Sequence, residues 1–532
     1  MAKEILFGSE ATNKMLIGMN KVADAVCATF GPKGRNAVFS QEYDVPLVTN
    51  DGYAIARQIT LSDKFENLGA TILREAAIKS NKATGDGTTG SVVLAKGIIN
   101  EAVKNIAAGA NEAFIKRGLN KATAVVVDSL KSFSKTDISL DIIKNVATVS
   151  GGNDPEIGEL FYQIYEELGN TAIVNIQITQ MAETKLVISH GCRLDSGYLS
   201  RYFLTDPGKN IGEYTDVAVF VYTGEITEIK EIYKLLEDCV QQDKALFIIA
   251  KDIKGEALSA LAANAEQKIL KVSAIKAPGY GDTRDRNLRA IAALCGATVI
   301  DPDLGYDMSN FGLEACGKVD KILVEKNITT LFGPACPDAP EVETLKSQIT
   351  ERLKTEQQLY EIDKLEQTLG MLNSAMAVIE VGGTSELEMF ERKYRIEDAM
   401  HACANAIKFG VVPGGGKALL NCEKVLTEYV DTLSGDEKTG ANIILTVLSE
   451  PIRQIAKNCG VEGSVIVNTL RENKNLNYGY DALNDSYGDL FKLQIIDPTY
   501  VIIHSFVNAV SIAGIFITSG AAIVESEGKD EE

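Results

Sequence analysis

The sequence predicts a multidomain protein whose two chain ends are mostly helical and enclose a smaller α/β region. At 532 residues, the chain is too long for one hydrophobic core and indicates about two to four domains. Long helical patterns broken by glycine-rich loops run from residue 1 to about 131 and again from about 409 to 524. Between about 190 and 375, the short apolar runs 217–221 and 245–250 predict strands that helical patterns separate.

The charge and the cysteines exclude several classes of function. Lys and Arg total 53 and Asp and Glu total 73, so the formal net charge is −20 and most of the surface repels nucleic acid. The nine cysteines are scattered and form no CxxC pair, so we interpret them as free thiols in a reducing compartment. His401 and Cys403 could form a catalytic dyad, but two residues apart on a helix they face different sides.

The chain is expected to be cytoplasmic and not to enter a membrane. Its uninterrupted apolar runs, such as 123–127 and 500–503, are far shorter than the roughly 20 residues that cross a bilayer. The first residues, MAKEILFGSEATNKML, have no apolar stretch behind a basic segment, and they contain acids that an organelle presequence avoids.

One glycine-rich loop, Thr84 to Gly90, carries a lone carboxylate between two helical patterns. Apolar residues at helical spacing precede it over 65–76 and follow it over 92–103, so the loop leads into a new helix. Its glycines let backbone N–H groups approach an anion, and its threonines can cap the next helix, whose first amides attract phosphate. Asp86 would repel that phosphate unless Mg²⁺ lay between them. The loop therefore predicts a site for a metal-bound triphosphate.

Taken alone, this loop is explained as well by an ordinary turn between helices. The Gly-Lys-Ser/Thr ending of a Walker A loop is absent. The phosphate interpretation gains from three further loops, namely Gly31–Gly34, Asn50–Gly52 with a second acid, and Gly414–Gly416. If all four loops serve one nucleotide, the two chain ends form a single domain that the middle of the chain interrupts.

Seven motifs follow one another along the chain: TFGPKGRN at 29–36, TNDG at 49–52, GDGTT at 85–89, RIEDAMHA at 395–402, GVVPGGGKALL at 410–420, NYGYDA at 477–482 and IIDPT at 495–499. In this order and at these separations, from about residue 3 to 524, the chain resembles the group I chaperonins, the GroEL family. The resemblance implies three domains: an equatorial ATP-binding domain (1–132 and 409–524), a small α/β intermediate hinge domain (133–189 and 376–408) and an α/β apical domain (190–375). The acidic composition of residues 525–532, where the family usually has Gly-Gly-Met repeats, predicts a disordered tail.

The resemblance also assigns a site for ATP, Mg²⁺ and potassium. Asp86 would hold Mg²⁺, and Asp398 would act with Asp51 in hydrolysis. Asn50 would offer a main-chain oxygen to the monovalent cation. The other residues around the nucleotide would be Thr29, Phe30, Gly31, Pro32, Gly87, Thr88, Thr89, Gly90, Gly414, Gly415, Asp481, Ala482 and Leu483 near the adenine, and Asp497 at the ribose.

The assigned roles agree with the chemistry of phosphoryl transfer. Water that attacks a γ-phosphate needs orientation and a nearby carboxylate more than covalent catalysis. An acid on a movable domain makes cleavage wait for closure. Without the resemblance, Asp398 would be interpreted as a surface acid paired with Arg395, three residues earlier.

A groove on the apical domain is implied to bind non-native polypeptide and the mobile loop of a GroES-type co-chaperonin. Apolar stripes over 228–240 and 256–270 would line it, although by pattern alone they are core faces. Open apolar patches bind partners with little sequence specificity. The groove residues would be Tyr198, Tyr202, Phe203, Tyr233, Leu236, Leu258, Ala262 and Ala263.

Several positions depart from the family pattern and leave two functions open. Ala262-Ala263 stands where a valine pair is usual, Ser374-Ala375 replaces a hinge Gly-Gly, and Ser196 replaces an arginine that pairs with an acid of the next subunit. The first function is an ATP-driven folding chaperone built from heptameric rings stacked in pairs. The second is a diverged scaffold or interaction protein with weak ATPase activity. A metabolic kinase has little support, because no small-molecule pocket signature accompanies the loops.

Overall fold

The computed structural model describes residues 3–40, 47–170, 172–179, 181–206, 208, 210–356, 358–373 and 375–525. The chain divides into two compact units. The first unit combines Met1–Glu166, Ile176–Thr184 and Val381–Glu532, and the second combines Glu167–Asn175 and Lys185–Glu380. The two chain ends therefore share one unit. The finer division into three domains stays a prediction, and both Ser374 of the altered hinge and tail residues 526–532 lie outside the described residues.

Helices dominate the first unit, and its strands are short. Its helices are α1 (Gly8–Cys27), α2 (Gly52–Gln58), α3 (Lys64–Thr84), α4 (Thr88–Ala107), α5 (Glu112–Phe133), α6 (Leu140–Ser150), α7 (Pro155–Leu168), α13 (Glu386–Phe409), α14 (Lys417–Asn421), α15 (Glu423–Val430), α16 (Gly435–Val447), α17 (Glu450–Asn458), α18 (Gly463–Glu472) and α19 (Thr499–Ile517). Its strands are β1 (Lys3–Phe7), β2 (Ala37–Phe39), β3 (Leu47–Thr49), β13 (Val411–Pro413), β14 (Tyr478–Asp481), β15 (Ser486–Asp489), β16 (Ile496–Pro498) and β17 (Ala521–Glu525).

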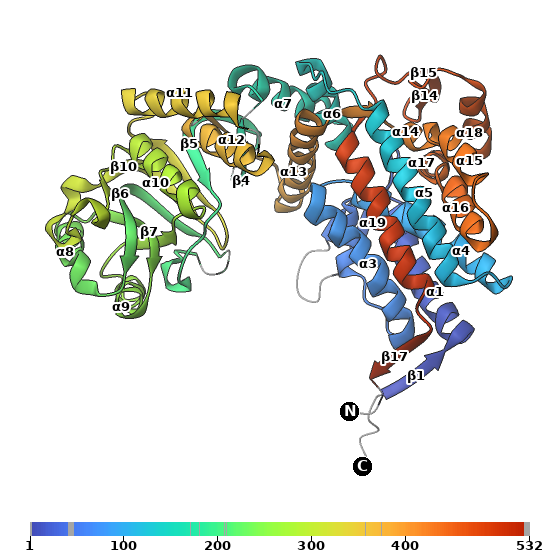
Figure 1. Ribbon diagram of the computed structural model, residues 1–532, viewed down its shortest axis with the longest axis horizontal. Helices are drawn as coiled ribbons and strands as arrows, with labels where there is room; N and C mark the ends of the chain where they lie inside the picture. The colour runs from blue at the N-terminus through green and yellow to red at the C-terminus, as the bar shows by residue number, and fades with distance from the viewer. Residues whose placement is uncertain are drawn as a thin grey trace, which may run out of the picture. The chain divides into compact units, whose positions relative to one another are not determined.

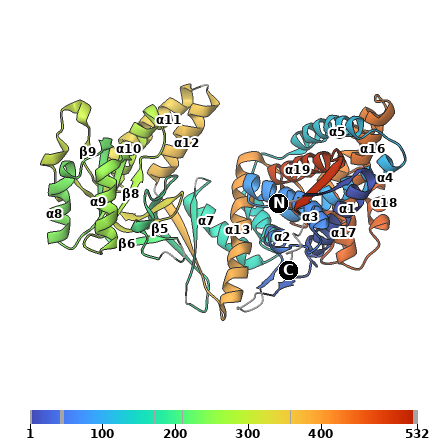
Figure 2. The ribbon, with the colours of Figure 1, turned by 90° about the horizontal axis from the view of Figure 1, so that it is seen from below.

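The first and last parts of the chain build one helical core. The C-terminal helix α19 packs against α3, α4 and α5, and α3 in blue and α19 in red lie side by side in Figure 1. Figure 2 shows the same neighbours from below. β1 pairs with β17 in antiparallel register, from Lys3 with Glu525 to Phe7 with Ala521. The predicted packing of the two chain ends is confirmed.

Two glycines allow α1 and α3 to cross with their backbones in contact. A Cβ atom on Gly18 of α1 would lie 1.8 Å from the carbonyl oxygen of Glu66. A Cβ atom on Gly69 of α3 would lie 1.8 Å from the carbonyl oxygen of Met15. Since real Cβ atoms do not approach backbone oxygens this closely, any side chain at either position forces the helices apart.

The helix α19 corrects the expectation that no segment could cross a membrane. Thr499–Ile517 is 19 residues long and, within the described residues, is apolar enough to span a bilayer by length and composition. Counting uninterrupted apolar runs missed it, because uncharged polar residues such as Ser505 and Asn508 break them. In the structure, 56% of its most apolar window is buried, and Phe506 and Phe516 belong to the helical core. Its apolar composition is that of a core helix.

Strands and helices alternate in the second unit. Its helices are α8 (Tyr233–Gln241), α9 (Gly255–Glu266), α10 (Gly281–Cys295), α11 (Pro340–Thr355) and α12 (Leu359–Asn373). Its strands are β5 (Lys185–Leu194), β6 (Gly212–Ile226), β7 (Ala245–Ile253), β8 (Val272–Lys276), β9 (Val299–Ile300), β10 (Gly317–Val324), β11 (Thr329–Pro334) and β12 (Ala375–Val381). With β4 (Ile173–Ile178), they form a sheet in the order β4-β12-β5-β11-β10-β6-β7-β8, and β9 pairs with β6.

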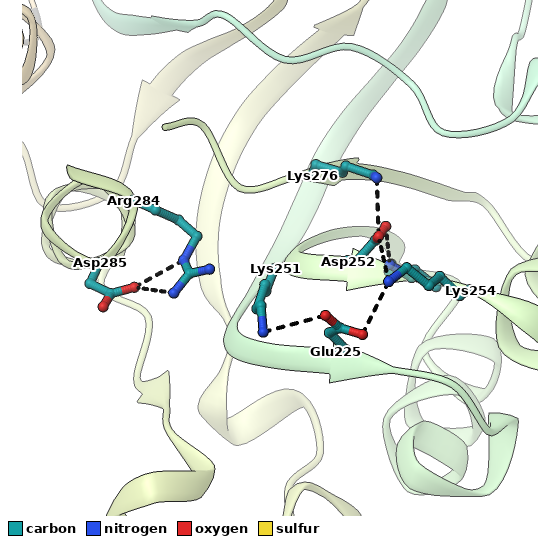
Figure 3. A network of polar contacts seen from close by, with 8 residues as sticks. Glu225, Lys251, Asp252, Lys254, Lys276, Arg284 and Asp285 are labelled. Atoms are coloured by element: carbon teal, nitrogen blue, oxygen red, sulfur yellow. Dashed lines mark hydrogen bonds and ion pairs between the residues drawn. The ribbon is translucent and has the colours of Figure 1, made fainter. Parts of the chain in front are cut away.

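Ion pairs tie together the ends of three parallel strands in this sheet. β6, β7 and β8 run parallel, so their carboxyl ends meet at one edge. Lys254 Nζ lies 3.1 Å from both Glu225 Oε2 and Asp252 Oδ2. Lys276 Nζ lies 3.0 Å from Asp252 Oδ2, and Lys251 Nζ lies 3.3 Å from Glu225 Oε1 (Figure 3). Because the lysines are well exposed, each pair adds little stability by itself.

The helices of this unit end at other places than the sequence patterns predict. Spaced leucines in the charged stretch 341–369 predict a single solvated helix, but the structure has two helices there, because the backbone is extended at Glu356 after α11. The stripe 228–240 begins with the 3₁₀ turn Ile229–Ile232 before α8. The stripe 256–270 is helical only to Glu266, since Lys268 adopts a left-handed backbone with φ of 57°.

The helix crossing gives a stability prediction. We expect Gly69→Ala to lower the free energy of unfolding by about 3 kcal/mol, the upper end of the usual cost of overpacking, because the new methyl group meets backbone rather than a movable side chain. Gly514→Ala in α19 is the matched control, since its Cβ meets only the flexible Lys116 side chain at 3.3 Å. We expect the control to change stability by less than about 1 kcal/mol. Urea unfolding followed by circular dichroism measures both variants. Equal free energies of unfolding for Gly69→Ala and Gly514→Ala would contradict the close backbone contact between α1 and α3.

Candidate functional site

A cavity of about 530 Å³ opens in the first unit. This volume lies within the roughly 300–1,000 Å³ range of small-molecule sites. The structure brings all eighteen residues of the predicted nucleotide site to its walls: Thr29, Phe30, Gly31, Pro32, Asn50, Asp51, Asp86, Gly87, Thr88, Thr89, Gly90, Asp398, Gly414, Gly415, Asp481, Ala482, Leu483 and Asp497. Residues from both chain ends therefore meet in one compartment.

The loop between α3 and α4 presents an uncapped helix N-terminus to the cavity. Gly85, with φ of 69°, is the C-cap residue that follows α3, and Gly87, with φ of 73°, occupies the N-cap of α4. No side chain accepts a hydrogen bond at this cap. Thr88 and Thr89 are the first helical residues, so the expectation that they cap the helix is wrong. The first amides of α4 are therefore left to an anion, which such helix ends attract.

Asp86 lies between these two glycines and is held from two sides. One carboxylate oxygen accepts a hydrogen bond from the Gly87 N–H, and the other accepts one from Ser150 Oγ at 3.2 Å. Ser150 ends α6, a helix that packs against α13. Burial raises the pKa of Asp86, and the negative charge of Asp51 raises it further. The loop thus fixes a carboxylate whose charge is poorly compensated.

The second predicted acid, Asp51, caps α2. Its carboxylate accepts hydrogen bonds from the N–H groups of Tyr53 at 2.9 Å and Ala54 at 3.0 Å. A Cβ atom on the next residue, Gly52, would lie 2.4 Å from Thr89 Oγ1, so this turn packs directly on the start of α4. Burial raises the pKa of Asp51 despite these two hydrogen bonds.

Asp398 reaches the cavity from α13. It does not pair with Arg395, because the Arg395 guanidinium binds Glu391 one turn earlier, at 2.8 Å from Nε to Oε1. The interpretation of Asp398 as an ordinary surface acid is therefore wrong. Burial raises the pKa of Asp398 well above its usual value, and the charges of Asp86 and Asp51 add to the effect.

Strand pairing places the fourth acid beside the triple-glycine loop. β13 pairs with β16, which sets Val412 opposite Asp497, and a Cβ atom on Gly414 would lie 3.1 Å from Asp497 Oδ1. Burial, with a contribution from the Asp86 charge, raises the pKa of Asp497 to about 7. Asp481 is different, because its carboxylate accepts hydrogen bonds from the Leu483 and Asn484 N–H groups and shapes the loop 482–484.

The residues at the cavity fit a magnesium nucleotide. Among the residues that the structure describes, two cationic side chains line the cavity, but Lys417 Nζ donates to Asn421 and the Arg395 guanidinium binds Glu391, so each has a partner outside the set of four acids. Within the described residues, no group of three or more His, Cys, Asp or Glu side chains forms a metal cage. Mg²⁺ commonly takes one or two carboxylates and completes its shell with phosphate oxygens and water. The acids and the uncapped helix therefore suit a metal-bound phosphate better than a metal ion alone or a phosphate alone.

Sequence reasoning missed several residues at the cavity. Ser150 ends α6, Asn153 comes from the turn after it, and Lys417 begins α14. The sequence signal for this turn was the glycine pair Gly151-Gly152 after Ser150, because the other loops of the site also contain clustered glycines. Lys417 is 4% exposed, and burial lowers its pKa. A lysine after three glycines gave no sequence signal of such burial.

The residues of the predicted polypeptide groove differ widely in exposure. Tyr202 and Tyr233 are 55% and 63% exposed, and Ala263 is also exposed. Tyr198, Leu236 and Leu258 are half-buried. Phe203 is fully buried in the core of the second unit and Ala262 is 9% exposed, so neither offers a surface in this structure. The aromatic pattern did not distinguish Phe203 from its exposed neighbour.

Comparison with known proteins identifies the family. A profile of the TCP-1/cpn60 chaperonin family matches residues 22–527. The chain belongs to this family. Two crystal structures of chaperonin gp146 from the bacteriophage EL 2 (Pseudomonas aeruginosa), both in the presence of ATP-BeFx, are similar to it. They are 21% and 19% identical, with TM-scores of 0.75 and 0.69, and in each case 98% of this chain and 99% of that chain are covered. The fold of this protein is thus a chaperonin fold.

The buried acids predict how the stability of this chaperonin depends on pH without nucleotide. A carboxyl group with a raised pKa in the folded state stabilises below its unfolded pKa, 3.8 for Asp497, and this contribution is lost as the pH rises through about 7. We expect Asp497→Asn to melt higher than the parent at pH 8, by roughly 2–4 °C, the shift that about 1 kcal/mol produces in large domains. At pH 4 the two proteins should melt alike.

Thermal melts at the two pH values, without magnesium or nucleotide, measure this difference. Asp137→Asn at an exposed position is the control and should follow the parent at both pH values. A destabilised Asp497→Asn protein at pH 8 would show that the carboxylate is compensated in the folded state.

Proposed function

We propose that this chaperonin is of group I and works as an ATP-driven folding chaperone. The observation that carries the proposal is the convergence of four acids with the uncapped start of α4 in one cavity; the acids are Asp51, Asp86, Asp398 and Asp497. Four separate segments supply them, so the arrangement depends on the tertiary fold. The presence of ATP-BeFx with chaperonin gp146, which shares the fold, supports an ATP site here.

Different residues bind different parts of the nucleotide. The amides at the start of α4 and the glycine loops at 31 and 414–415 line the phosphates, and Asp86 holds Mg²⁺. When bound, Mg²⁺ would supply positive charge that offsets the charges of Asp86 and the phosphates. Asp497 meets the ribose, and Ala482 and Leu483 lie at the adenine. The main-chain oxygen of Asn50 would bind the potassium ion.

Asp398 and Asp51 act on the attacking water. Both line the cavity from separate elements, α13 and the start of α2. A carboxylate whose pKa is raised by burial accepts a proton more readily than an exposed one, and Asp398 has a strongly raised pKa. Orientation of the water by two fixed acids lowers the barrier through positioning. Asp398 is therefore the base in this proposal and Asp51 its partner.

The assembly and its partners follow from the same proposal. Heptameric rings stacked in pairs enclose non-native polypeptide, and a GroES-type co-chaperonin closes them in the cytoplasm. The exposed Tyr202, Tyr233 and Ala263 of the second unit, with the half-buried Tyr198, Leu236 and Leu258, make the first contacts with unfolded chains. Neither nucleic acid nor a membrane is a partner, in keeping with the net charge of −20 and the buried α19.

A diverged scaffold with weak ATPase activity is the competing function. Burial of Phe203 and Ala262 favours it, because two of the eight groove residues offer no surface to a client. Refolding of a denatured test protein separates the two functions. The folding chaperone raises the yield only with ATP and a co-chaperonin, whereas the scaffold leaves the yield at its spontaneous level.

The hydrolytic role of Asp398 gives a kinetic prediction. We expect Asp398→Ala to slow steady-state ATP turnover by at least about 100-fold, the lower end of what a positioned general base contributes. Nucleotide affinity should stay within about twofold, because the phosphates are bound by the loops and by Asp86.

Glu397→Gln is the matched control, since this neighbouring carboxylate is outside the cavity lining and pairs with Lys393 at 3.5 Å. It should keep turnover within about twofold. Turnover assays and nucleotide titration on the same preparations measure both quantities. Unchanged turnover in Asp398→Ala would remove the acid from the mechanism.

A further inference from the structure

The helix that carries Asp398 makes a second contact with the phosphate loop, outside the cavity. Asp398, His401 and Asn405 are spaced by three and four residues on α13, so they share one face of the helix. Asp398 lines the cavity, whereas His401 and Asn405 do not. These two side chains therefore do not contact a nucleotide in the cavity, and their contacts lie within the protein.

Asn405 caps the end of the helix that leads into the loop. Its Nδ2 donates a hydrogen bond to the carbonyl oxygen of Thr84 at 2.8 Å, across 321 residues of sequence. Thr84 is the last residue of α3, so its carbonyl has no partner within the helix. The Thr84 hydroxyl meanwhile donates to the Asp86 carbonyl oxygen at 2.7 Å. Asn405 is thus connected to the loop two residues before the proposed magnesium ligand.

His401 packs on the next residue of the loop. A Cβ atom on Gly85 would lie 2.2 Å from Cγ and 2.4 Å from Cδ2 of His401, so the imidazole covers the Cα of Gly85. Gly85 has φ of 69°, a conformation that other residues rarely adopt. Both the conformation and the close approach therefore require glycine at this position.

The two contacts and the hydrogen bond from Ser150 surround the loop. Ser150 on α6 holds the Asp86 carboxylate at 3.2 Å, while His401 and Asn405 on α13 hold the backbone just before it. α6 and α13 pack against each other. The position of Asp398 relative to Asp86 is consequently set by contacts between groups of the protein itself.

We propose that Asn405 and His401 are positioning residues that fix α13, and with it Asp398, on the loop that carries Asp86. The inference rests on the proposed ATPase function. A small error in the position of a water-orienting acid lowers the rate strongly, whereas nucleotide affinity depends on groups that these two residues do not touch. The loss of the contact therefore affects the chemical step and leaves binding unchanged.

The test compares kcat with nucleotide affinity in the full-length protein. We expect Asn405→Ala to lower kcat for ATP hydrolysis about tenfold and to keep the Kd for ATP within about twofold. Asn405→Gln keeps an amide donor and should recover part of the rate. Tyr394→Ala, at a 38% exposed position of the same helix, is the control and should keep both constants.

A double variant distinguishes positioning from a general structural role. Because Asn405 acts through Asp398, Asp398→Ala with Asn405→Ala should turn over ATP no more slowly than Asp398→Ala alone. Additive losses, an unchanged kcat in Asn405→Ala, or a loss of nucleotide affinity would each overturn the inference. Full activity of Asp398→Ala would overturn the hydrolytic role proposed for Asp398 as well, whereas a slow Asp398→Ala with a normal Asn405→Ala would overturn only the positioning role.

Discussion

Repulsion among carboxylates in one cavity is the constraint on which the site depends. Asp51, Asp86, Asp398 and Asp497 face the same space, and burial together with their neighbours' charges raises the pKa of Asp86, Asp398 and Asp497, while burial alone raises that of Asp51. Buried like charges are unfavourable unless a proton or a cation compensates them. The cationic side chains that line the cavity bind other partners. A ligand is therefore needed to compensate the negative charge of the four acids. In the proposed function, a magnesium nucleotide would supply positive charge at the acids and negative charge at the amides of α4.

The scaffold holds these acids close because the two chain ends form one core. Glycines at the crossing of α1 and α3, the apolar helix α19 and the pairing of β1 with β17 hold the ends together. Three of the acids come from caps, turns or short strands: Asp51 caps α2, Asp86 lies in the turn between α3 and α4, and Asp497 lies in the three-residue strand β16. Asp398 is the exception, since it lies within α13 and reaches the cavity only if the whole helix is correctly placed. Contacts on both sides of Asp86 provide that placement.

The loops of the site were predictable from the sequence, because each combines glycines with an acid or a threonine at the end of a helical pattern. The role proposed for Asp398 was not predictable from the local sequence, since one acid in a charged helix carries no local signal. That role came only from the resemblance to chaperonins. The cap from Asn405 to Thr84 was also invisible, because it joins residues 321 positions apart. Two features differ from what the sequence patterns predict. Uncharged polar residues interrupt the apolar runs of α19, and the adjacent aromatics Tyr202 and Phe203 differ in exposure although their chemistry is similar.

The dependence of ATP binding on magnesium tests this account most directly. Isothermal titration of the purified protein with ATP, in the presence of Mg²⁺ and in the presence of a chelator, gives both affinities. The account predicts saturable binding with Mg²⁺ and at least about tenfold weaker binding without it, because the acids then repel the phosphates. Asp86→Asn, which keeps the size of the side chain and removes its charge, should reduce this difference. Equal affinity for ATP with and without Mg²⁺ in the parent protein would contradict the central role of the four acids.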